Sequence, residues 1–389
     1  MKRPTITPKR AVWAGLLGTP LALIVVLAAV GVGMAPAAKV ATQAPAAARG
    51  EPPVSTRLKS PAATAAYWTP EKMATAQPLP MEGPSTATAT VAGDTATGAP
   101  GAAGGYAPAN LLEPGVAAAG VSSTSPATFG QTSTGIAPAD GGYPGPGTFF
   151  KWYPKYRTYP VSTIAKMFFT QYGSNFSCSA SVTFGASLDT VWTAGHCVHA
   201  GDNSVNGWSS NVLICPSYIN GVNPAVGCWS GVTVWTSGEW YSSSALSRDY
   251  GMVITAATGT VIADHIVNAT GGLAFAWNLG RDQHWVNFGY PVLPNPPFNG
   301  GAINTCAAEH RYDVVTDGLG PATNSQGCNS GRGSSGGPWI VGLSGTSGYI
   351  NSDNSWLYLA EEGHEIQGPY FDTQVCNFWK LVTGWGGAC

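Results

Sequence analysis

Residues 178–197 read CSASVTFGASLDTVWTAGHC, and this stretch decides the fold. Two runs in it, 178–184 and 189–195, are short and rich in Val, Thr and aromatic residues, which is typical of β-strands. The second run leads into His196, and Cys197 follows directly. A bridge from Cys197 back to Cys178 would hold the imidazole in place, as a general base requires.

A glycine-rich loop far along the chain carries a second motif. It reads GSSGGP over residues 333–338 and leads into the apolar run 339–341. Glycines have no side chain, so several backbone N–H groups can crowd around one point. The N–H groups of Gly333 and Ser335 would then form an oxyanion hole for acyl transfer, where a single donor contributes about 10²–10³ in rate.

An aspartate lies between these two motifs in the sequence, at the start of an apolar run that is typical of a strand. Asp249 opens the run DYGMVI, residues 249–254. A buried carboxylate there can accept the N–H of the far imidazole nitrogen and hold the required tautomer. Asp202, Asp264 and Asp282 open no comparably apolar run.

Together, TAGHC (193–197), RDYGMVI (248–254) and GSSGGP (333–338) resemble the motifs of the trypsin-like serine peptidases, in the order His, Asp, Ser. The resemblance extends from about Tyr153 to Cys389. YPVSTIAKMFF (159–169) and GPYF (368–371) are most similar to bacterial exported members near the glutamyl endopeptidases. The resemblance implies an all-β fold, with two six-stranded antiparallel β-barrels, the catalytic cleft between them and a C-terminal helix.

The same resemblance implies a role for each motif residue. Ser335 is expected to be the nucleophile, His196 the general base and then the acid, and Asp249 the carboxylate that orients the imidazole. The oxyanion would be received by the N–H groups of Gly333 and Ser335. The residues expected to pair with the substrate backbone are Asn354, Ser355 and Trp356.

One residue of the loop departs from the pattern of the animal enzymes. Ser334 stands where they carry an Asp that pairs with a newly cut N-terminal amine. A hydroxyl cannot offset the desolvation of a buried ammonium, which costs several kcal/mol. We therefore expect local hydrogen bonds of the glycine-rich loop to order the oxyanion hole.

The cysteines point to an oxidising compartment. All eight lie after residue 177, and an even number confined to one stretch favours disulfides. Zinc is the rival interpretation, but no C-x2-C pair is present, and we expect no metal and no cofactor. The resemblance implies a Cys178–Cys197 bridge, and proximity in sequence predicts Cys215–Cys228, Cys306–Cys328 and Cys376–Cys389.

Strand-like runs dominate the second half of the chain. They recur at 162–170, 178–184, 189–195, 211–215, 231–236, 250–257, 284–290, 337–343 and 355–360, between Gly, Asn and Ser breaks. Only residues 372–384 have the spacing of a helix. Many short strands joined by glycine-rich turns favour a barrel or sandwich.

The N-terminal part differs in composition. Basic residues at 2, 3, 9 and 10 precede an apolar run, 11–34, so residues 1–37 are predicted to be a signal peptide or a retained signal anchor. Residues 38–148 are mainly Ala, Pro, Thr, Gly and Ser and predict a disordered linker, or alternatively a folded inhibitory propeptide. The peptidase domain is expected over 149–389. Either leader would place it outside the cell, secreted or anchored at the surface.

These features favour an exported monomeric serine endopeptidase that acts on protein or peptide substrates. A net charge of −2, with 10% charged residues, offers no basic stripe, so we expect no nucleic-acid partner. A membrane partner would be reached only through the N-terminal anchor. A catalytically silent binding or adhesion protein on the same fold is one alternative. A serine esterase is another, because Gly333-x-Ser335-x-Gly337 also fits a nucleophile elbow with Asp353 and His364 downstream.

Overall fold

The computed structural model describes residues 50–80, 83, 90–92, 104–107, 150–151, 156–357 and 365–389. The predicted leader, 1–37, and most of the predicted linker lie outside these residues. Within them, no helix combines the length and the apolar character needed to cross a bilayer.

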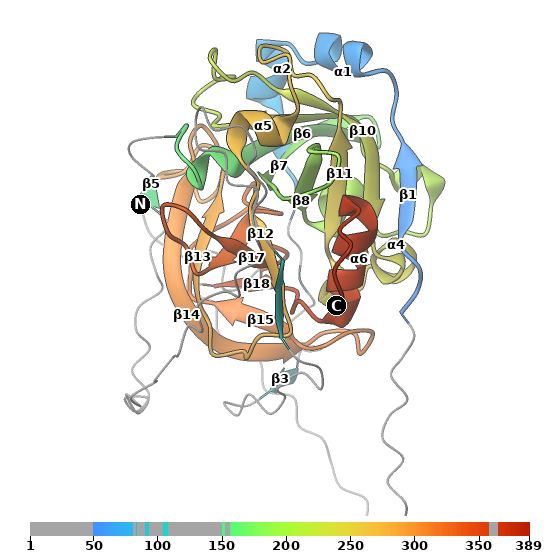
Figure 1. The fold of residues 1–389 in the computed structure, drawn as a ribbon, viewed down its shortest axis with the longest axis vertical. Helices are drawn as coiled ribbons and strands as arrows, with labels where there is room; N and C mark the ends of the chain where they lie inside the picture. Colours follow the sequence, from blue (N-terminus) through green and yellow to red (C-terminus); the bar gives the residue numbers. More distant parts are fainter. Residues whose placement is uncertain are drawn as a thin grey trace, which may run out of the picture. The chain divides into compact units, whose positions relative to one another are not determined.

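Six strands of the first sheet close into a barrel (Figure 1). They are β6 Ile164–Gln171, β7 Ser174–Val182, β8 Thr190–Thr193, β9 Ser210–Pro216, β10 Trp229–Thr236 and β11 Gly251–Thr255. Their order is β10-β11-β8-β7-β6-β9, and antiparallel pairing of β9 with β10 completes the ring. All eight residues of β6 are buried, because one face of this strand fills the barrel while the other is covered by neighbouring segments.

The second sheet is also mainly antiparallel. Its principal strands are β12 Ala274–Trp277, β13 His284–Gly289, β14 Asn304–Val315, β15 Thr323–Gln326, β16 Pro338–Val341, β17 Tyr349–Asp353 and β18 Ile366–Gly368. Three short strands extend it, namely β3 Thr90–Ala92, β4 Gly105–Ala107 and β5 Phe150–Lys151. Pairings among the described residues do not join its end strands, β18 and β4. The all-β class with one closed six-stranded barrel is confirmed, and a second closed barrel stays a prediction.

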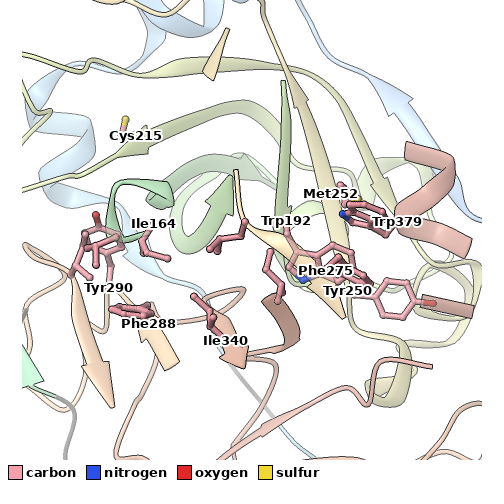
Figure 2. Close-up of a cluster of buried hydrophobic side chains, with 14 of the residues drawn as sticks. Ile164, Trp192, Cys215, Tyr250, Met252, Phe275, Phe288, Tyr290, Ile340 and Trp379 are labelled. Carbon is pink, nitrogen blue, oxygen red and sulfur yellow. The ribbon is translucent and has the colours of Figure 1, made fainter. Parts of the chain in front are cut away.

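A cluster of aromatic side chains joins the barrel, the second sheet and the C-terminal helix (Figure 2). Trp192 of β8 lies with its ring centroid 5.2 Å from that of Phe275 on β12. Phe275 in turn stacks on Trp379, at 5.0 Å and 11°. Trp379 belongs to α6, Thr373–Thr383. Rings of this size bury large apolar areas, so this cluster fixes how the barrel meets the second sheet.

Most of the predicted elements are present. Strands occupy eight of the nine predicted runs, and α6 matches the predicted helix. In the run 355–360, Trp356 makes an isolated bridge to Gln367. Residues 358–360 are outside the described part, so the strand expected there stays a prediction. Strands β12, β14, β15 and β17 were not predicted. β14 and β15 are rich in polar residues, which weakens the alternation on which a strand prediction depends.

Part of the predicted disordered linker is folded. Residues 50–80 form β1 Val54–Arg57, α1 Pro61–Tyr67, α2 Pro70–Thr75 and β2 Gln77–Pro78. β1 pairs with β10, and α1 packs on β9 and β10 (Figure 1). The prediction of disorder counted only the apolar surface that the segment can bury within itself. Trp68, Met73 and Leu79 are instead buried against the barrel, which offsets the entropy of ordering the segment.

All four predicted disulfides are present. They are Cys178–Cys197, Cys215–Cys228, Cys306–Cys328 and Cys376–Cys389. Cys178, Cys197 and His196 lie close enough together to resemble a metal-ligand group. Because the two sulfurs are bonded to each other, they cannot act as thiolate ligands.

One ion pair ties the chain just before Asp249 to the C-terminal helix. The buried guanidinium of Arg248 donates to both carboxylate oxygens of Asp372, each at 2.9 Å. Oδ1 of Asp372 also accepts the backbone N–H groups of Gln374 and Val375, which caps the N-terminus of α6. The capping residue therefore also neutralises a buried charge.

We expect Asp372→Ala to lower the free energy of unfolding by about 3–5 kcal/mol, because it leaves a buried guanidinium unpaired. Guanidinium chloride unfolding, followed by tryptophan fluorescence with the disulfides intact, measures the change. Asp282→Ala removes an exposed carboxylate and should change stability by less than about 0.5 kcal/mol. Equal effects of the two substitutions would contradict the importance of this pair.

Candidate active site

His196 lies just after strand β8. The strand ends at Thr193, and the short helix α3, Gly195–Val198, begins two residues later and contains the histidine. A Cβ on Gly195 would lie 2.9 Å from Oδ1 of Asp249 and 2.8 Å from Cγ of Trp240. Only glycine therefore lets the carboxylate approach this closely, and the Cys178–Cys197 bridge holds the helix to β7.

Asp249 is fully buried and accepts three hydrogen bonds. Its Oδ1 accepts the backbone N–H of His196 at 2.7 Å. Its Oδ2 lies 2.7 Å from Nδ1 of His196 and also accepts the hydroxyl of Ser355. An ionised carboxylate can only accept, so Nδ1 carries the proton and Nε2 is left as the basic nitrogen.

The glycine-rich loop between β15 and β16 packs directly against the residues that precede His196. The carbonyl of Ser335 accepts the N–H of Ser179 on β7, at 2.7 Å. Gly336 has φ +76°, and a Cβ there would lie 2.1 Å from Oγ1 of Thr193. This close approach requires glycine, and it brings Ser335 to the same corner of the barrel as His196.

Two buried polar atoms at this corner have no hydrogen-bond partner. They are Nε2 of His196 and Oγ of Ser335. Other buried polar atoms of the described residues also lack a partner, so what distinguishes these two is that they belong to the His and Ser motifs and lie on elements packed against each other. Catalytic hydrogen bonds are often unmade until substrate binds, and these two atoms are those that acyl transfer would couple.

The predicted oxyanion donors are also unused. No described residue accepts a hydrogen bond from the backbone N–H of Gly333 or Ser335. Gly333 has φ +97°, in the region that favours glycine. The hydroxyl of Ser334 donates to the carbonyl of Gly331 at 2.8 Å and contacts the hydroxyl of Ser330. The loop is thus ordered by local hydrogen bonds, as expected from the absence of an Asp at 334.

The predicted substrate-pairing residues separate into two kinds. Asn354 is fully buried, its carbonyl accepts the N–H of Gly336, and its own N–H donates to Gly337. Both of its backbone groups therefore already have partners in the glycine-rich loop, and its pairing with substrate stays a prediction. The sequence alone did not reveal that this asparagine bonds back into the glycine-rich loop.

The next two residues lie at the cleft itself. Ser355 and Trp356 both line a cavity of about 530 Å³ beside His196 and Asp249. No described residue donates to the carbonyl of Ser355, so it remains available to a peptide. Sequence reasoning missed the bond from the Ser355 hydroxyl to Asp249, because nothing local distinguishes this serine from others.

Sequence reasoning also missed three residues that line the cavity from the N-terminal segment. They are Leu79, Pro80 and Gly83. The one signal was the stretch YWTPEKMATAQPLP, residues 67–80, which is more apolar and aromatic than its surroundings.

A second buried carboxyl lies behind Asp249. Oδ2 of Asp353 accepts the indole N–H of Trp192 at 2.8 Å, and Oδ1 has no partner. Complete burial, together with the nearby charge of Asp249, raises the pKa of Asp353 well above its ordinary value. Asp353 bonds Trp192, whereas His196 bonds Asp249, so Asp353 is not the carboxylate that the esterase-type elbow would require for this histidine.

The loop geometry excludes the elbow for a second reason. Such a serine lies on a strand-to-helix turn of a mainly parallel sheet, whereas Ser335 lies between two strands of a mainly antiparallel sheet. His364, the other elbow candidate, is outside the described residues.

We expect Asp353→Asn to make the protein more stable than the parent at neutral pH. The parent carboxyl stays protonated when folded but ionises when unfolded, so its contribution favours unfolding as pH rises above 3.8, the ordinary value. Asparagine keeps an acceptor for Trp192 and does not titrate. Unfolding free energies measured across pH should show a difference that vanishes below pH 3.8; a difference independent of pH would contradict the raised pKa.

No protein-family model and no curated protein matches the chain. Solved structures, in contrast, do match the chain. The thermostable serine protease AL20 from an extremophilic microorganism is 29% identical, with a TM-score of 0.51, over 57% of this chain and 97% of that one. The protease Anisep from Arthrobacter nicotinovorans is 30% identical, with a TM-score of 0.52, over 58% of this chain and 97% of its own.

A Glu endopeptidase in complex with MPD aligns at 16% identity and a TM-score of 0.46, over 62% of this chain and 98% of that one. The expected closeness to the glutamyl endopeptidases stays a prediction. The match to Anisep spans nearly that whole protease, and the barrel, the glycine-rich loop and the buried His–Asp pair are all in place. The chain therefore belongs to the trypsin-like serine proteases of the chymotrypsin fold.

Proposed function

We propose that the protein is an exported serine endopeptidase that cleaves peptide bonds through an acyl-enzyme on Ser335. The observation that carries this is the pair of unpartnered buried atoms, Nε2 of His196 and Oγ of Ser335, next to a fully bonded Asp249.

The proposed reaction has two steps, acylation and deacylation of Ser335, and each step uses the same catalytic groups. Oγ of Ser335 attacks the substrate carbonyl carbon while Nε2 of His196 takes the hydroxyl proton. The carbonyl oxygen becomes an oxyanion, which the N–H groups of Gly333 and Ser335 stabilise. As the C–N bond breaks, the proton passes from Nε2 to the leaving amine. Water then repeats the sequence in place of Ser335, releasing the acid and restoring the enzyme.

Asp249 supports both steps without losing its charge. Its bonds to the imidazole Nδ1–H and to the backbone N–H of His196 fix the ring and stabilise the imidazolium that forms. The third bond, from Ser355, holds the carboxylate from the side of the second sheet. Ser355 is therefore a positioning residue in the proposal.

Export is supported by the four disulfides, which persist only in oxidising surroundings. The predicted leader fits secretion, with anchoring at the cell surface as the alternative. We further propose a monomer, a protein or peptide substrate, no cofactor, and a second barrel closed as the family implies.

We expect Ser335→Ala and His196→Ala each to lower kcat by about 10⁴–10⁶, and the double variant to be little worse than either, because a triad acts as a unit. Hydrolysis of a small ester and of a peptide measures this. Ser243→Ala and His284→Ala replace exposed residues of the same types and should retain full activity.

A serine-directed phosphonate provides a second readout. Peptide mapping of the folded, treated protein should find the adduct on Ser335 and none on Ser334. Labelling at Ser334, or full activity in Ser335→Ala, would refute the proposed mechanism.

A further inference from the structure

A segment that precedes the catalytic domain crosses the barrel and ends in the cleft. We define the N-terminal strap as residues 50–80 together with Gly83. It starts on the β10 side of the barrel, where β1 pairs with β10 over four residues and the N–H of Leu58 donates to Val232 at 2.8 Å. The N–H of Glu51 also bonds the carboxylate of Glu239, at 2.9 Å. Main-chain bonding of this kind holds a segment without regard to most of its side chains.

The middle of the strap is held by aromatic residues. Trp68 is 5% exposed, its ring lies 5.4 Å from that of Phe168, and its indole N–H donates to the carbonyl of Asn211. The hydroxyl of the adjacent Tyr67 donates to Asn175 at 2.8 Å. Burial of a tryptophan with its N–H satisfied is among the strongest anchors a surface segment can make.

The strap then runs along the strand that carries Cys178. β2 pairs in parallel with Phe176 and Ser177 of β7, and the N–H of Leu79 donates to the carbonyl of Ser177 at 3.3 Å. Leu79 is 7% exposed and belongs to the apolar cluster of the barrel. The strap thus occupies the β7 edge beside His196.

The end of the strap lies against the segment that follows β17. The N–H of Gly83 donates to the carbonyl of Leu357 at 3.2 Å. A Cβ on Gly83 would lie only 2.2 Å from Cε3 of Trp356, so the main chain packs closely on that ring. Leu79 and Gly83 thus donate to the main-chain carbonyls of Ser177 and Leu357, and both line the cavity beside His196.

We propose that the N-terminal strap is an intramolecular inhibitor that keeps the peptidase latent by occupying its cleft. This rests on the proposed function. An extended peptide that needs the edges at Ser177 and Leu357 must first displace the strap. Because the strap is tethered to the domain it blocks, its effective concentration does not fall on dilution. The measured kcat/KM then scales with the fraction of molecules whose cleft is open.

The test uses the full chain with substitutions that eject the strap from the cleft. Leu79→Asp places a charge in an apolar cluster, and Gly83→Val places a branched side chain where the Trp356 ring lies. Each should raise kcat/KM for a peptide substrate by about tenfold or more. Leu381→Asp and Gly345→Val make the same changes at exposed sites, 345 having no neighbour within 4 Å, and should change nothing.

Circular dichroism confirms that the variants fold, and hydrogen exchange at the amides of Leu58 and Leu79 reports whether the strap has left. Peptide hydrolysis in the parent equal to that in Leu79→Asp, with Ser335→Ala inactive, would overturn the strap proposal and leave the proposed function standing. Failure of every variant to hydrolyse ester or peptide, with Ser335 unlabelled by the phosphonate, would instead overturn the proposed function. A tenfold rise that disappears when Ser335→Ala is added supports both.

Discussion

The buried carboxylate of Asp249 is the interaction on which the rest of the site depends. It accepts two bonds from His196, which comes from the barrel, and one from Ser355, which follows the last strand of the second sheet's central hairpin. A fully buried charge is costly unless all of its acceptor positions are used. The bonds to this one carboxylate therefore add to the contacts that the aromatic cluster makes between the barrel and the second sheet, and they leave Nε2 of the histidine as the free basic atom.

Two further ionisable side chains, Arg248 and Asp353, lie buried near Asp249. Arg248, the preceding residue, is neutralised by the carboxylate that caps α6, so its buried guanidinium adds no uncompensated charge near the site. Asp353 lies nearby, and burial together with the charge of Asp249 raises its pKa well above the ordinary value. The N–H donors of His196 go to Asp249, whereas Asp353 accepts only the indole N–H of Trp192.

The cleft is defined by main-chain groups as much as by side chains. Ser355 lines it, and the strap residues Leu79 and Gly83, which also line it, donate to the carbonyls of Ser177 and Leu357. Backbone acceptors on an exposed edge bind any extended chain of suitable shape. A segment of the same polypeptide that binds these acceptors competes with substrate for them. The buried aromatic side chains of the strap hold it where it can do so.

Local sequence determined the chemistry of this protein. The motifs around His196, Asp249 and Ser335, the glycine-rich loop 333–338 and the four disulfides were all predicted, because a crowded backbone and covalent bonding restrict which residue types can stand there. Tertiary structure alone decided the rest. It turned Asn354 inward, brought Ser355 onto Asp249, used the polar strand β14 as the centre of a sheet, and folded part of an Ala- and Pro-rich segment onto the barrel. Each of these depends on hydrogen bonds or buried contacts between residues far apart in the chain, and such partners leave no periodic pattern in the local sequence.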